Sequence, residues 1–367
     1  MSDPSTMPSV VTPEQVASLP SVVLHDHLDG GLRPETMVEL ADAAGYRGLP
    51  SDDPSTLSVW MQRGASRGDL ALYLETFTHT VGVMQTADAL ARVARECAED
   101  LAADGVVYAE VRFAPELHTD GGLPLDGVVE AVADGFRAGS ERASIGLGPI
   151  VTAMRTGHRS LEIADLAVRW ADRGVVGFDL AGAEAGFPAT AHRAAFDRVL
   201  ADGRLGTTIH AGEGDGLDSI RGALACGSRR IGHGVRLADD LTDHDGRPTL
   251  GPLAREIRDR GVPLEMCPTS NVHSGAVGSI EEHPIGVLAE LGFQVTINTD
   301  NRLMSATTQS RETVLIARAN DWDLVRLEQT TRTAAEAAFL PLHERSRLVE
   351  QVIRPAFHRL ARPAAGS

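Results

Sequence analysis

Short apolar segments alternate with longer amphipathic segments along most of the chain. About eight short segments are apolar on both faces, which is typical of parallel strands covered by helices on either side. Strand–helix alternation repeated about eight times predicts an α/β fold, the (β/α)8 or TIM barrel. The candidate strands are Val22–Leu24, Val106–Phe113, Ile145–Met154, Val175–Leu180, Gly206–His210, Arg230–Gly232, Val262–Met266 and Gln294–Asn298.

The intervals between these strands have helical periodicity. The clearest case is the segment 87–104, where the apolar positions recur at spacings that make one helical face. Cys97 lies on this face, and we expect it to be a small buried hydrophobe rather than a reactive thiol. The apolar residues of the face are Leu90, Val93, Ala94, Cys97 and Leu101.

A long insertion separates the first predicted strand from the helix at 87–104. It covers about residues 30–86, and Pro34–Ala44 and Leu70–Met84 within it have helical patterns. An insertion of this length at one end of a barrel is typical of a lid over an active site. Tyr73, Leu74 and Phe77 are its apolar candidates for lining a pocket, with ordinary helix packing as the alternative.

The domain organisation follows from length and end composition. Barrels of this kind often exceed the usual domain length, so residues 21–362 are expected to form one domain, insertion included. Ser, Pro and Gly are frequent in residues 1–20 and 363–367, and both ends are therefore expected to be flexible.

Charge and lysine content exclude several classes of function. The 367 residues include 34 basic and 51 acidic side chains, a net charge of -17, and every basic residue is arginine. Without lysine the chain cannot form a Schiff base, hold pyridoxal phosphate on a lysine, or bridge two metals with a modified lysine. The acidic balance argues against nucleic acids and anionic membranes as partners.

Cysteine usage and hydropathy predict the compartment. Three widely spaced cysteines do not form a disulfide framework. The first twenty residues lack the basic and apolar regions of a signal peptide, and no apolar run reaches the ~20 residues of a membrane span. We therefore expect a soluble cytoplasmic protein.

Polar clusters follow four of the predicted strands. His25 and His27 end the first strand, and residues at i and i+2 of a strand point to the same face. A lone His-x-His is a weak signal. However, His210 ends the fifth strand, His233 the sixth and Asp300 the eighth. Because barrel enzymes place their active sites at the carboxyl ends of the strands, these clusters predict one shared site.

The residue types in these clusters indicate metal-assisted hydrolysis. Zinc prefers imidazole and carboxylate ligands and keeps one position for water, so the first three histidines and Asp300 are candidates to bind one zinc ion. Such an ion lowers the pKa of its water towards ~7. Glu213 is a candidate general acid if burial raises its pKa. His233, between two glycines, is a candidate to orient that water or accept its proton.

The motifs together resemble a known family. HDHLDG (25–30), DLAG (179–182), HAGE (210–213), IGHG (231–234) and NTD (298–300) occur in this order. Over residues 20–360 they resemble adenosine deaminase of the amidohydrolase superfamily. CPTSN at 267–271 and TDNRLMS at 299–305 are most similar to its bacterial branch. The resemblance implies one Zn²⁺ per chain and hydrolysis of adenosine and 2′-deoxyadenosine to inosine, 2′-deoxyinosine and ammonia.

The resemblance also implies residue roles. It gives His25, His27, His210 and Asp300 the role of zinc ligands. Glu213 matches the acid that protonates purine N1, and His233 matches the residue that positions and deprotonates the attacking water. The substrate contacts that it implies come from Asp29 to the ribose 5′-hydroxyl, from the Gly182 N–H to N3, and from Asn301 and His27.

One position departs from the animal members of the family. They have an aspartate after the metal-binding aspartate, to bind purine N7, and this chain has Asn301 there. An amide donates to N7 without needing a proton of its own. Met154 is a candidate to contact the base, with core packing as the alternative. Asp215 and Asp218 add negative charge that disfavours a phosphorylated substrate, unless they belong to a solvated loop.

Other functions remain open at this stage. The chain could deaminate another 6-aminopurine, such as adenine, a nucleotide or a modified nucleoside, although Asp29 favours a free 5′-hydroxyl. It could also be an inactive binding homologue. The chain lacks the H-x-E…P-C-x-x-C signature of cytidine-type deaminases, so we do not expect that chemistry. The expected partner is a small purine nucleoside, and the oligomeric state is open. We expect the remaining histidines to be superficial or structural: His79, His118, His158, His192, His244, His273, His283, His343 and His358.

Overall fold

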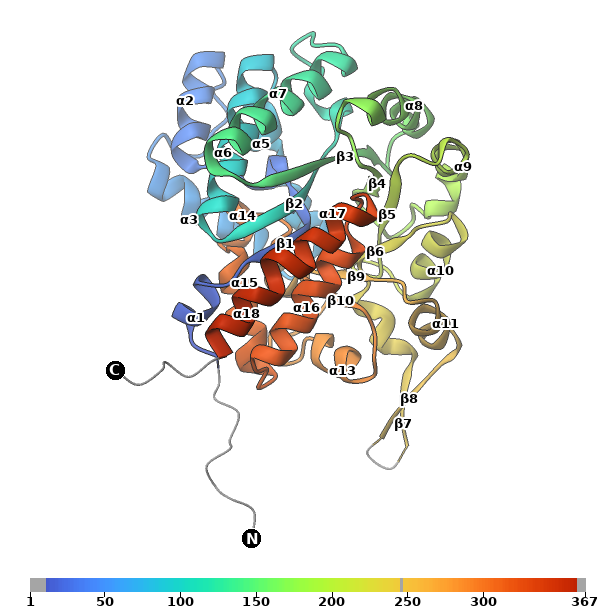
Figure 1. Ribbon diagram of the computed structural model, residues 1–367. Helices are drawn as coiled ribbons and strands as arrows, with labels where there is room; N and C mark the ends of the chain where they lie inside the picture. Colours follow the sequence, from blue (N-terminus) through green and yellow to red (C-terminus); the bar gives the residue numbers. More distant parts are fainter. Residues whose placement is uncertain (1–10, 245–246, 362–367) are drawn as a thin grey trace, which may run out of the picture.

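The centre of the protein is an eight-stranded parallel sheet in the order β1-β2-β3-β4-β5-β6-β9-β10 (Figure 1). The structure is a computed structural model, and it describes residues 11–244 and 247–361. Each of the eight predicted strands overlaps an observed one. The strands are β1 (Ser21–His27), β2 (Val106–Phe113), β3 (Gly146–Met154), β4 (Gly177–Ala181), β5 (Gly206–Ala211), β6 (Arg230–His233), β9 (Leu264–Met266) and β10 (Val295–Ile297).

Hydrogen bonds between the first and last strands close the barrel. The His27 N–H donates to the Asp300 carbonyl at 2.7 Å, and the Asp300 N–H donates to the His25 carbonyl at 2.9 Å. One residue earlier, the Leu24 N–H donates to Asn298 Oδ1 at 2.8 Å. The predicted (β/α)8 fold is therefore confirmed, and this closure places Asp300 beside both histidines of β1.

Helices cover the outside of the barrel (Figure 1). The predicted helix at 87–104 is α6, whose N-terminus is capped by Thr86 Oγ1 accepting from the Ala89 N–H. Cys97 is buried on its inner face, as expected. Helix α6 spans Ala87–Ala103. The helices after β2 are α7 (Leu125–Ala143), α8 (Ser160–Trp170), α9 (Arg193–Asp202), α10 (Leu217–Ala225), α11 (Pro252–Arg260), α12 (Pro268–His273), α13 (Ile285–Glu290), α14 (Arg302–Ser305), α15 (Gln309–Ala319) and α16 (Leu324–Ala337).

Short helical turns connect several of these elements. They are the 3-10 turns η1 (Leu28–Gly30), η2 (Pro115–His118), η3 (Ala171–Arg173), η4 (Ala189–His192) and η5 (Val235–Asp240). At the C-terminal end α17 (Leu342–Arg347), the π-helical segment η6 (Leu348–Ile353) and α18 (Arg354–Ala361) follow one another and pack on α16. No helix of the described residues has the length and apolarity needed to cross a membrane.

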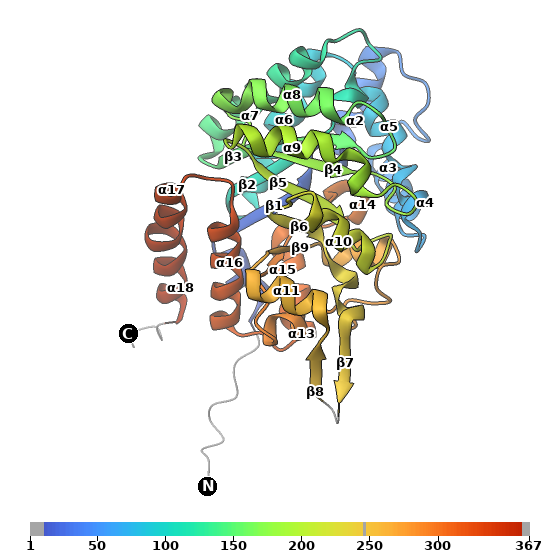
Figure 2. The ribbon, with the colours of Figure 1, turned by 90° about the vertical axis from the view of Figure 1, so that its right-hand side faces the viewer.

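The insertion after β1 is helical, as predicted. It contains α2 (Pro34–Ala44), α3 (Pro54–Ala65), α4 (Leu70–Leu74) and α5 (Phe77–Val83). The sequence pattern predicted one helix over Leu70–Met84, but the helix is interrupted because the hydroxyl and N–H of Thr76 both donate to the Tyr73 carbonyl. Helix α3 was not expected from the sequence pattern. Figure 2 shows α3 and α4 on one side of the barrel and α17 and α18 on the opposite side.

The N-terminal end differs from the expectation of flexibility through residue 20. Helix α1 (Pro13–Ala17) begins with a capping box, in which Thr12 and Gln15 each accept from the other's N–H. Val11, Val16 and Leu19 are buried in the core. Their apolar side chains anchor this segment, so the ordered domain begins before β1. Residues 1–10 and 363–367 lie outside the described residues.

A β-hairpin that the sequence analysis did not predict projects from the barrel after β6 (Figures 1 and 2). It consists of β7 (Leu241–His244) and β8 (Arg247–Leu250), paired antiparallel. Because the hairpin lies outside the eight-stranded sheet, it leaves the order of the barrel strands unchanged.

The barrel interior contains charged groups as well as apolar side chains. Glu265 on β9 is fully buried and lies 2.8 Å from Arg112 Nη2 and 2.5 Å from Arg230 Nε. Arg112 also contacts Asp179 at 3.2 Å, and Arg230 contacts Glu110 at 2.5 Å. Glu265 thus joins two buried cations, and removal of any one of these charged groups would leave a buried charge without its partner.

Replacing Glu265 by Gln is expected to lower the free energy of unfolding by about 3–5 kcal/mol, because it leaves two buried guanidinium groups short of negative charge. Urea unfolding followed by circular dichroism measures the change. The exposed Glu281→Gln is the matched control and should unfold like the parent protein. A stability for Glu265→Gln equal to that of the control would show that the network does not support the fold.

Candidate metal centre and active site

Four side chains from three strand ends converge at one point. His25 and His27 come from β1, His210 comes from β5, and Asp300 follows β10. The Nε2 atoms of His25 and His27 each lie 3.3 Å from Asp300 Oδ1, and His27 Nε2 lies 3.2 Å from His210 Nε2. The four prospective ligand atoms lie within 4.8 Å of one another. The structure therefore brings together all four residues predicted to bind a metal.

The backbone at this site is held in an uncommon conformation. Asp300 and His233 have φ values of 57° and 61°, in the left-handed region that residues with a Cβ seldom adopt. Such conformations cost on the order of 1–3 kcal/mol and cluster at functional sites. In this protein they turn two side chains at strand ends towards the same point.

Buried carboxylates orient two of the imidazoles. Glu265 Oε2 lies 2.9 Å from His25 Nδ1, and Asp179 Oδ1 lies 3.2 Å from His210 Nδ1. Each carboxylate accepts the Nδ1 proton of its neutral histidine, so the lone pair on Nε2 faces the other ligands. His25 Nε2 is buried and has no hydrogen-bond partner among the described residues.

This donor set fits a divalent cation. Three imidazole nitrogens and a carboxylate match the ligands that zinc prefers. The pKa of Asp300 is held well below its usual range: burial alone would raise it, but its interactions with the surrounding imidazoles of His25, His233 and His27 outweigh burial. Ser270 Oγ donates to Asp300 Oδ2 at 2.5 Å and fixes the carboxylate. An ionised, oriented carboxylate is what a metal ligand requires.

A cavity of about 390 Å³ opens next to these ligands. Helices α4 and α5 contribute one wall, with Tyr73, Leu74 and Phe77, and Met154 at the end of β3 contributes another. All four predicted pocket residues therefore line the cavity. The opening and closing of the insertion as a lid stays a prediction.

The candidate acid and the candidate water-orienting residue face each other in this cavity. Glu213 Oε2 lies 3.4 Å from His233 Nε2, and both side chains are buried. Burial raises the pKa of Glu213 well above its usual value, and the negative charge of Asp300 raises it further. The protonated form of Glu213 is thus favoured, which is the state that a general acid needs before it reacts.

Glu184, which was not among the residues expected at the site, holds the loop that carries Glu213. Its carboxylate accepts from three consecutive backbone N–H groups, those of Gly212 at 2.6 Å, Glu213 at 3.0 Å and Gly214 at 2.7 Å. A carboxylate that receives several N–H groups is a strong, directional anchor. The only sequence signal was its position two residues after the DLAG motif.

The three other predicted substrate-binding residues, Asp29, Gly182 and Asn301, also line the cavity. Burial raises the pKa of Asp29 to about 7, and its Oδ1 has no partner among the described residues. Gly182 has a φ of 104°, which favours glycine. Asn301 packs so closely on Gly30 that a Cβ there would lie 1.9 Å from Asn301 Oδ1. These three residues therefore share one cavity wall with the candidate metal ligands His27, His210 and Asp300.

Two acidic residues predicted near the mouth are exposed. Asp218 lies 2.7 Å from Arg221, so its charge is partly balanced, and Asp215 accepts from the Gly216 N–H at 2.7 Å. Asp215 lies in the exposed segment before α10 and Asp218 in the first turn of that helix, and neither is among the residues that line the cavity.

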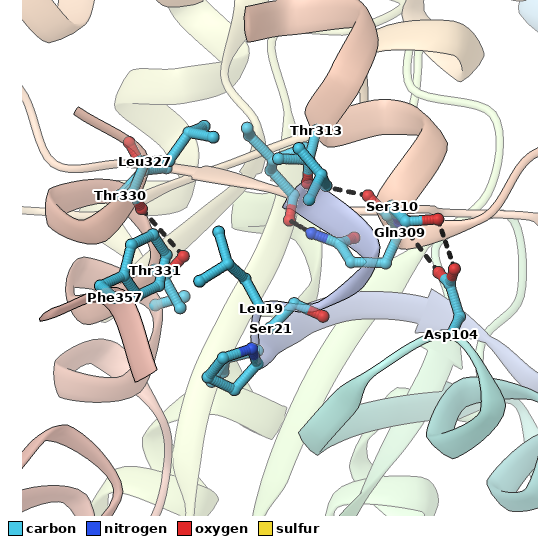
Figure 3. A pocket seen from close by; sticks show the side chains of 15 residues that line it. Leu19, Ser21, Asp104, Gln309, Ser310, Thr313, Leu327, Thr330, Thr331 and Phe357 are labelled. Carbon is cyan, nitrogen blue, oxygen red and sulfur yellow. Dashed lines mark hydrogen bonds between the residues drawn. The ribbon is translucent and has the colours of Figure 1, made fainter. Parts of the chain in front are cut away.

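A second cavity lies at the opposite end of the barrel, where β1 begins (Figure 3). Its volume is about 30 Å³, room for one water molecule. Ser21 Oγ and Gln309 Oε1, buried polar atoms of two of its lining residues, have no partner in the described part of the chain. A cavity of this size is too small to hold a nucleoside or another organic substrate.

Comparison with known sequences identifies relatives over almost the whole chain. The family model described as adenosine deaminase matches residues 20–355. Adenosine deaminase 1 of Streptomyces coelicolor is 52% identical over 98% of this chain and 92% of that protein. The adenosine deaminase of Mycobacteroides abscessus is 54% identical over 93% of this chain and 96% of its own length.

Comparison with solved structures supports the same fold. An adenine deaminase from Arthrobacter aurescens has a TM-score of 0.79 at 25% identity, covering 91% of this chain and 98% of that one. An amidohydrolase from Burkholderia ambifaria, solved with bound zinc, has a TM-score of 0.83 at 23% identity and covers 98% and 96%. At 23% identity, the similarity to the Burkholderia protein shows only that the two chains share a fold.

Proposed function

The chain belongs to the adenosine deaminase family, and we propose that it hydrolyses adenosine and 2′-deoxyadenosine to inosine and 2′-deoxyinosine with release of ammonia. It is an enzyme of the hydrolytic deaminase type. The main structural support for this proposal is that four candidate metal ligands converge with Glu213 and His233 at a single cavity.

We propose one zinc ion per chain, held by His25, His27, His210 and Asp300. The three imidazoles and the ionised carboxylate, whose prospective ligand atoms lie within 4.8 Å of one another, support this assignment. When bound, zinc supplies the chemistry of lowering the pKa of a water molecule so that it attacks near neutral pH.

The protein residues then handle the substrate and its protons. Glu213 holds a proton that it passes to purine N1, which makes C6 electrophilic. His233, 3.4 Å from Glu213, holds the attacking water against the C6 face. Once it has protonated N1, the Glu213 carboxylate takes a proton from the attacking water, and attack at C6 gives a tetrahedral carbon. Glu213 passes that proton to the amine, which leaves as ammonia, and it receives the remaining hydroxyl proton as the C6 carbonyl of inosine forms. The raised pKa of Glu213 supports its part, because an ionised carboxylate has no proton to give.

We propose that the nucleoside is positioned by polar atoms around the ligands. Asp29 accepts from the ribose 5′-hydroxyl, the Gly182 N–H donates to N3, and the amide of Asn301 donates to N7. The unpartnered, buried Oδ1 of Asp29 supports the first contact, since a buried acceptor gains a partner when substrate binds. His27 lines the cavity beside the same substrate.

Adenine is the alternative substrate, because a structural neighbour is named an adenine deaminase. The cavity extends past the metal ligands to Asp29 and α4, which provides space for a ribose that free adenine would leave unused. A nucleotide is disfavoured because no arginine is among the described residues that line the cavity, whereas Asp29, Glu213 and Asp300 are. We therefore expect adenosine to react faster than adenine or AMP.

Asp29→Ala is expected to lower kcat/KM for adenosine by about 10–100-fold, the cost of one lost hydrogen bond to a charged group. The matched substrate is 5′-deoxyadenosine, which lacks the hydroxyl and should react with both proteins at similar kcat/KM. Initial rates on the two substrates measure the difference. Equal losses on both would place Asp29 away from the 5′-hydroxyl.

A further inference from the structure

Asn271 lies behind His233, outside the wall of the cavity. It belongs to α12, directly after β9, and is fully buried. Its Nδ2 lies 3.0 Å from His233 Nδ1. His233 Nε2 is the nitrogen on the cavity side, 3.4 Å from Glu213 Oε2. The two ring nitrogens of His233 therefore have different neighbours, and the contact with Asn271 decides which one carries the proton.

A backbone donor fixes the orientation of the Asn271 amide. The Cys267 N–H donates to Asn271 Oδ1 at 3.2 Å, and a backbone N–H acts only as a donor. The oxygen of the amide is therefore the atom that faces Cys267. The NH2 group must face His233, and it donates to Nδ1.

His283 supports the same assignment from the other side. The Ile285 N–H donates to His283 Nδ1 at 3.2 Å, so the neutral His283 ring carries its proton on Nε2. That Nε2 lies 3.2 Å from Asn271 Oδ1 and donates to it. Burial lowers the pKa of His283 to about 3, which keeps the ring neutral. Two independent donors thus hold the amide in one orientation.

We infer that Asn271, anchored by the Cys267 N–H and by His283, is a positioning residue that fixes the neutral His233 ring with its proton on Nε2. Since Nδ1 accepts from Asn271, the nitrogen facing the cavity is an N–H donor. His233 then holds the attacking water by donating to its oxygen and does not take its proton. This inference rests on the proposed function and chooses between the two roles, orientation and deprotonation, that the sequence left open for His233.

Asn271→Asp provides a near-isosteric test. Both anchoring donors keep an acceptor oxygen, but the second oxygen can only accept, so it requires the proton of His233 on Nδ1. Nε2 then loses its proton and cannot donate towards the cavity. Asn271→Asp should therefore lower kcat about 100-fold, as loss of one preorganised donor does, with KM within a few-fold of the parent value.

The direct readout is the protonation of the His233 ring nitrogens in zinc-loaded protein labelled with ¹⁵N-histidine. Two-bond ¹H–¹⁵N correlation spectra distinguish the tautomers, and His233→Gln assigns the signals. We expect protonated Nε2 in the parent protein and protonated Nδ1 in Asn271→Asp. A parent ring protonated on Nδ1 would overturn the inference even if the variant failed to fold.

The rate measurement tests the donor role separately. Near-normal kcat in Asn271→Asp, with the tautomer switched, would overturn it. His283→Gln is the conservative control, since its amide NH2 can replace the donor to Asn271; it should keep the parent tautomer and most of kcat. Parent protein with the expected tautomer but no turnover of adenosine would contradict the proposed function and leave the tautomer assignment supported.

Discussion

Replacing Glu213 by Gln is expected to lower kcat for adenosine by about 10²–10⁴-fold, the usual contribution of a positioned general acid. Glutamine has nearly the same shape and is held by the same loop, whose backbone N–H groups bind Glu184. It has no acidic proton for purine N1. The rate is followed by the ultraviolet change on deamination, and metal analysis should still find one zinc per chain.

The dependence of kcat/KM on pH tests the role of Glu213 as the acid. Because the pKa of Glu213 is raised and the protonated form is the active one, kcat/KM should fall as the pH rises through that pKa. Glu213→Gln should lack this limb. The exposed Glu130→Gln is the control and should keep the parent rate and profile. A Glu213→Gln protein with near-normal kcat would exclude Glu213 as the acid.

The second large effect is expected from His27→Ala. His27 Nε2 faces both Asp300 and His210, so its removal opens the metal centre. Changes to groups that only orient a ligand already cost about 10–100-fold in metal affinity, and loss of a ligand itself should exceed this. Competition with a chromophoric chelator measures zinc affinity, and adenosine turnover should follow zinc occupancy.

The control for His27→Ala is His343→Ala, at a histidine whose side chain is 82% exposed. It should bind zinc and turn over adenosine as the parent protein does. If His27→Ala kept the zinc affinity of the parent, His27 would not be a ligand, and the three remaining side chains would have to account for binding.

Sequence periodicity predicted the barrel because parallel strands buried on both faces appear as short apolar runs, and each of the eight was found. The same reasoning placed His25, His27, His210 and Asp300 at one end of the barrel, since carboxyl ends of parallel strands meet there. The structure brings these residues together; their roles remain proposals. Residues 11–20 were expected to be flexible because local composition does not show that Val16 and Leu19 reach the core.

The supporting residues could not be predicted in the same way. Glu184 and Glu213 are far apart in sequence, as are Asn271 and His233, and only the closed barrel brings each pair into contact. No short spacing rule connects them. Glu265 lies within an apolar strand, where the sequence shows a buried charge but not which cations it joins.

The absence of lysine has a structural counterpart. Arg112 and Arg230 are buried cations of the barrel interior, and both contact Glu265. A guanidinium group offers several donors in one plane and bridges different acceptors: Arg112 also donates to the Leu24 carbonyl at 2.8 Å. A lysine ammonium lacks this planar arrangement. These arginines connect the core of the barrel to Glu265, which orients the proposed metal ligand His25.

The proposed function is tested most directly by incubating purified protein that contains one zinc per chain with adenosine and measuring both products. Equal amounts of inosine and ammonia are expected, with turnover lost on removal of zinc by a chelator and regained when zinc is returned. Parallel rates on adenine and AMP should be much lower. Zinc-loaded protein that leaves adenosine unchanged, or that converts adenine or AMP faster, would contradict the proposed function.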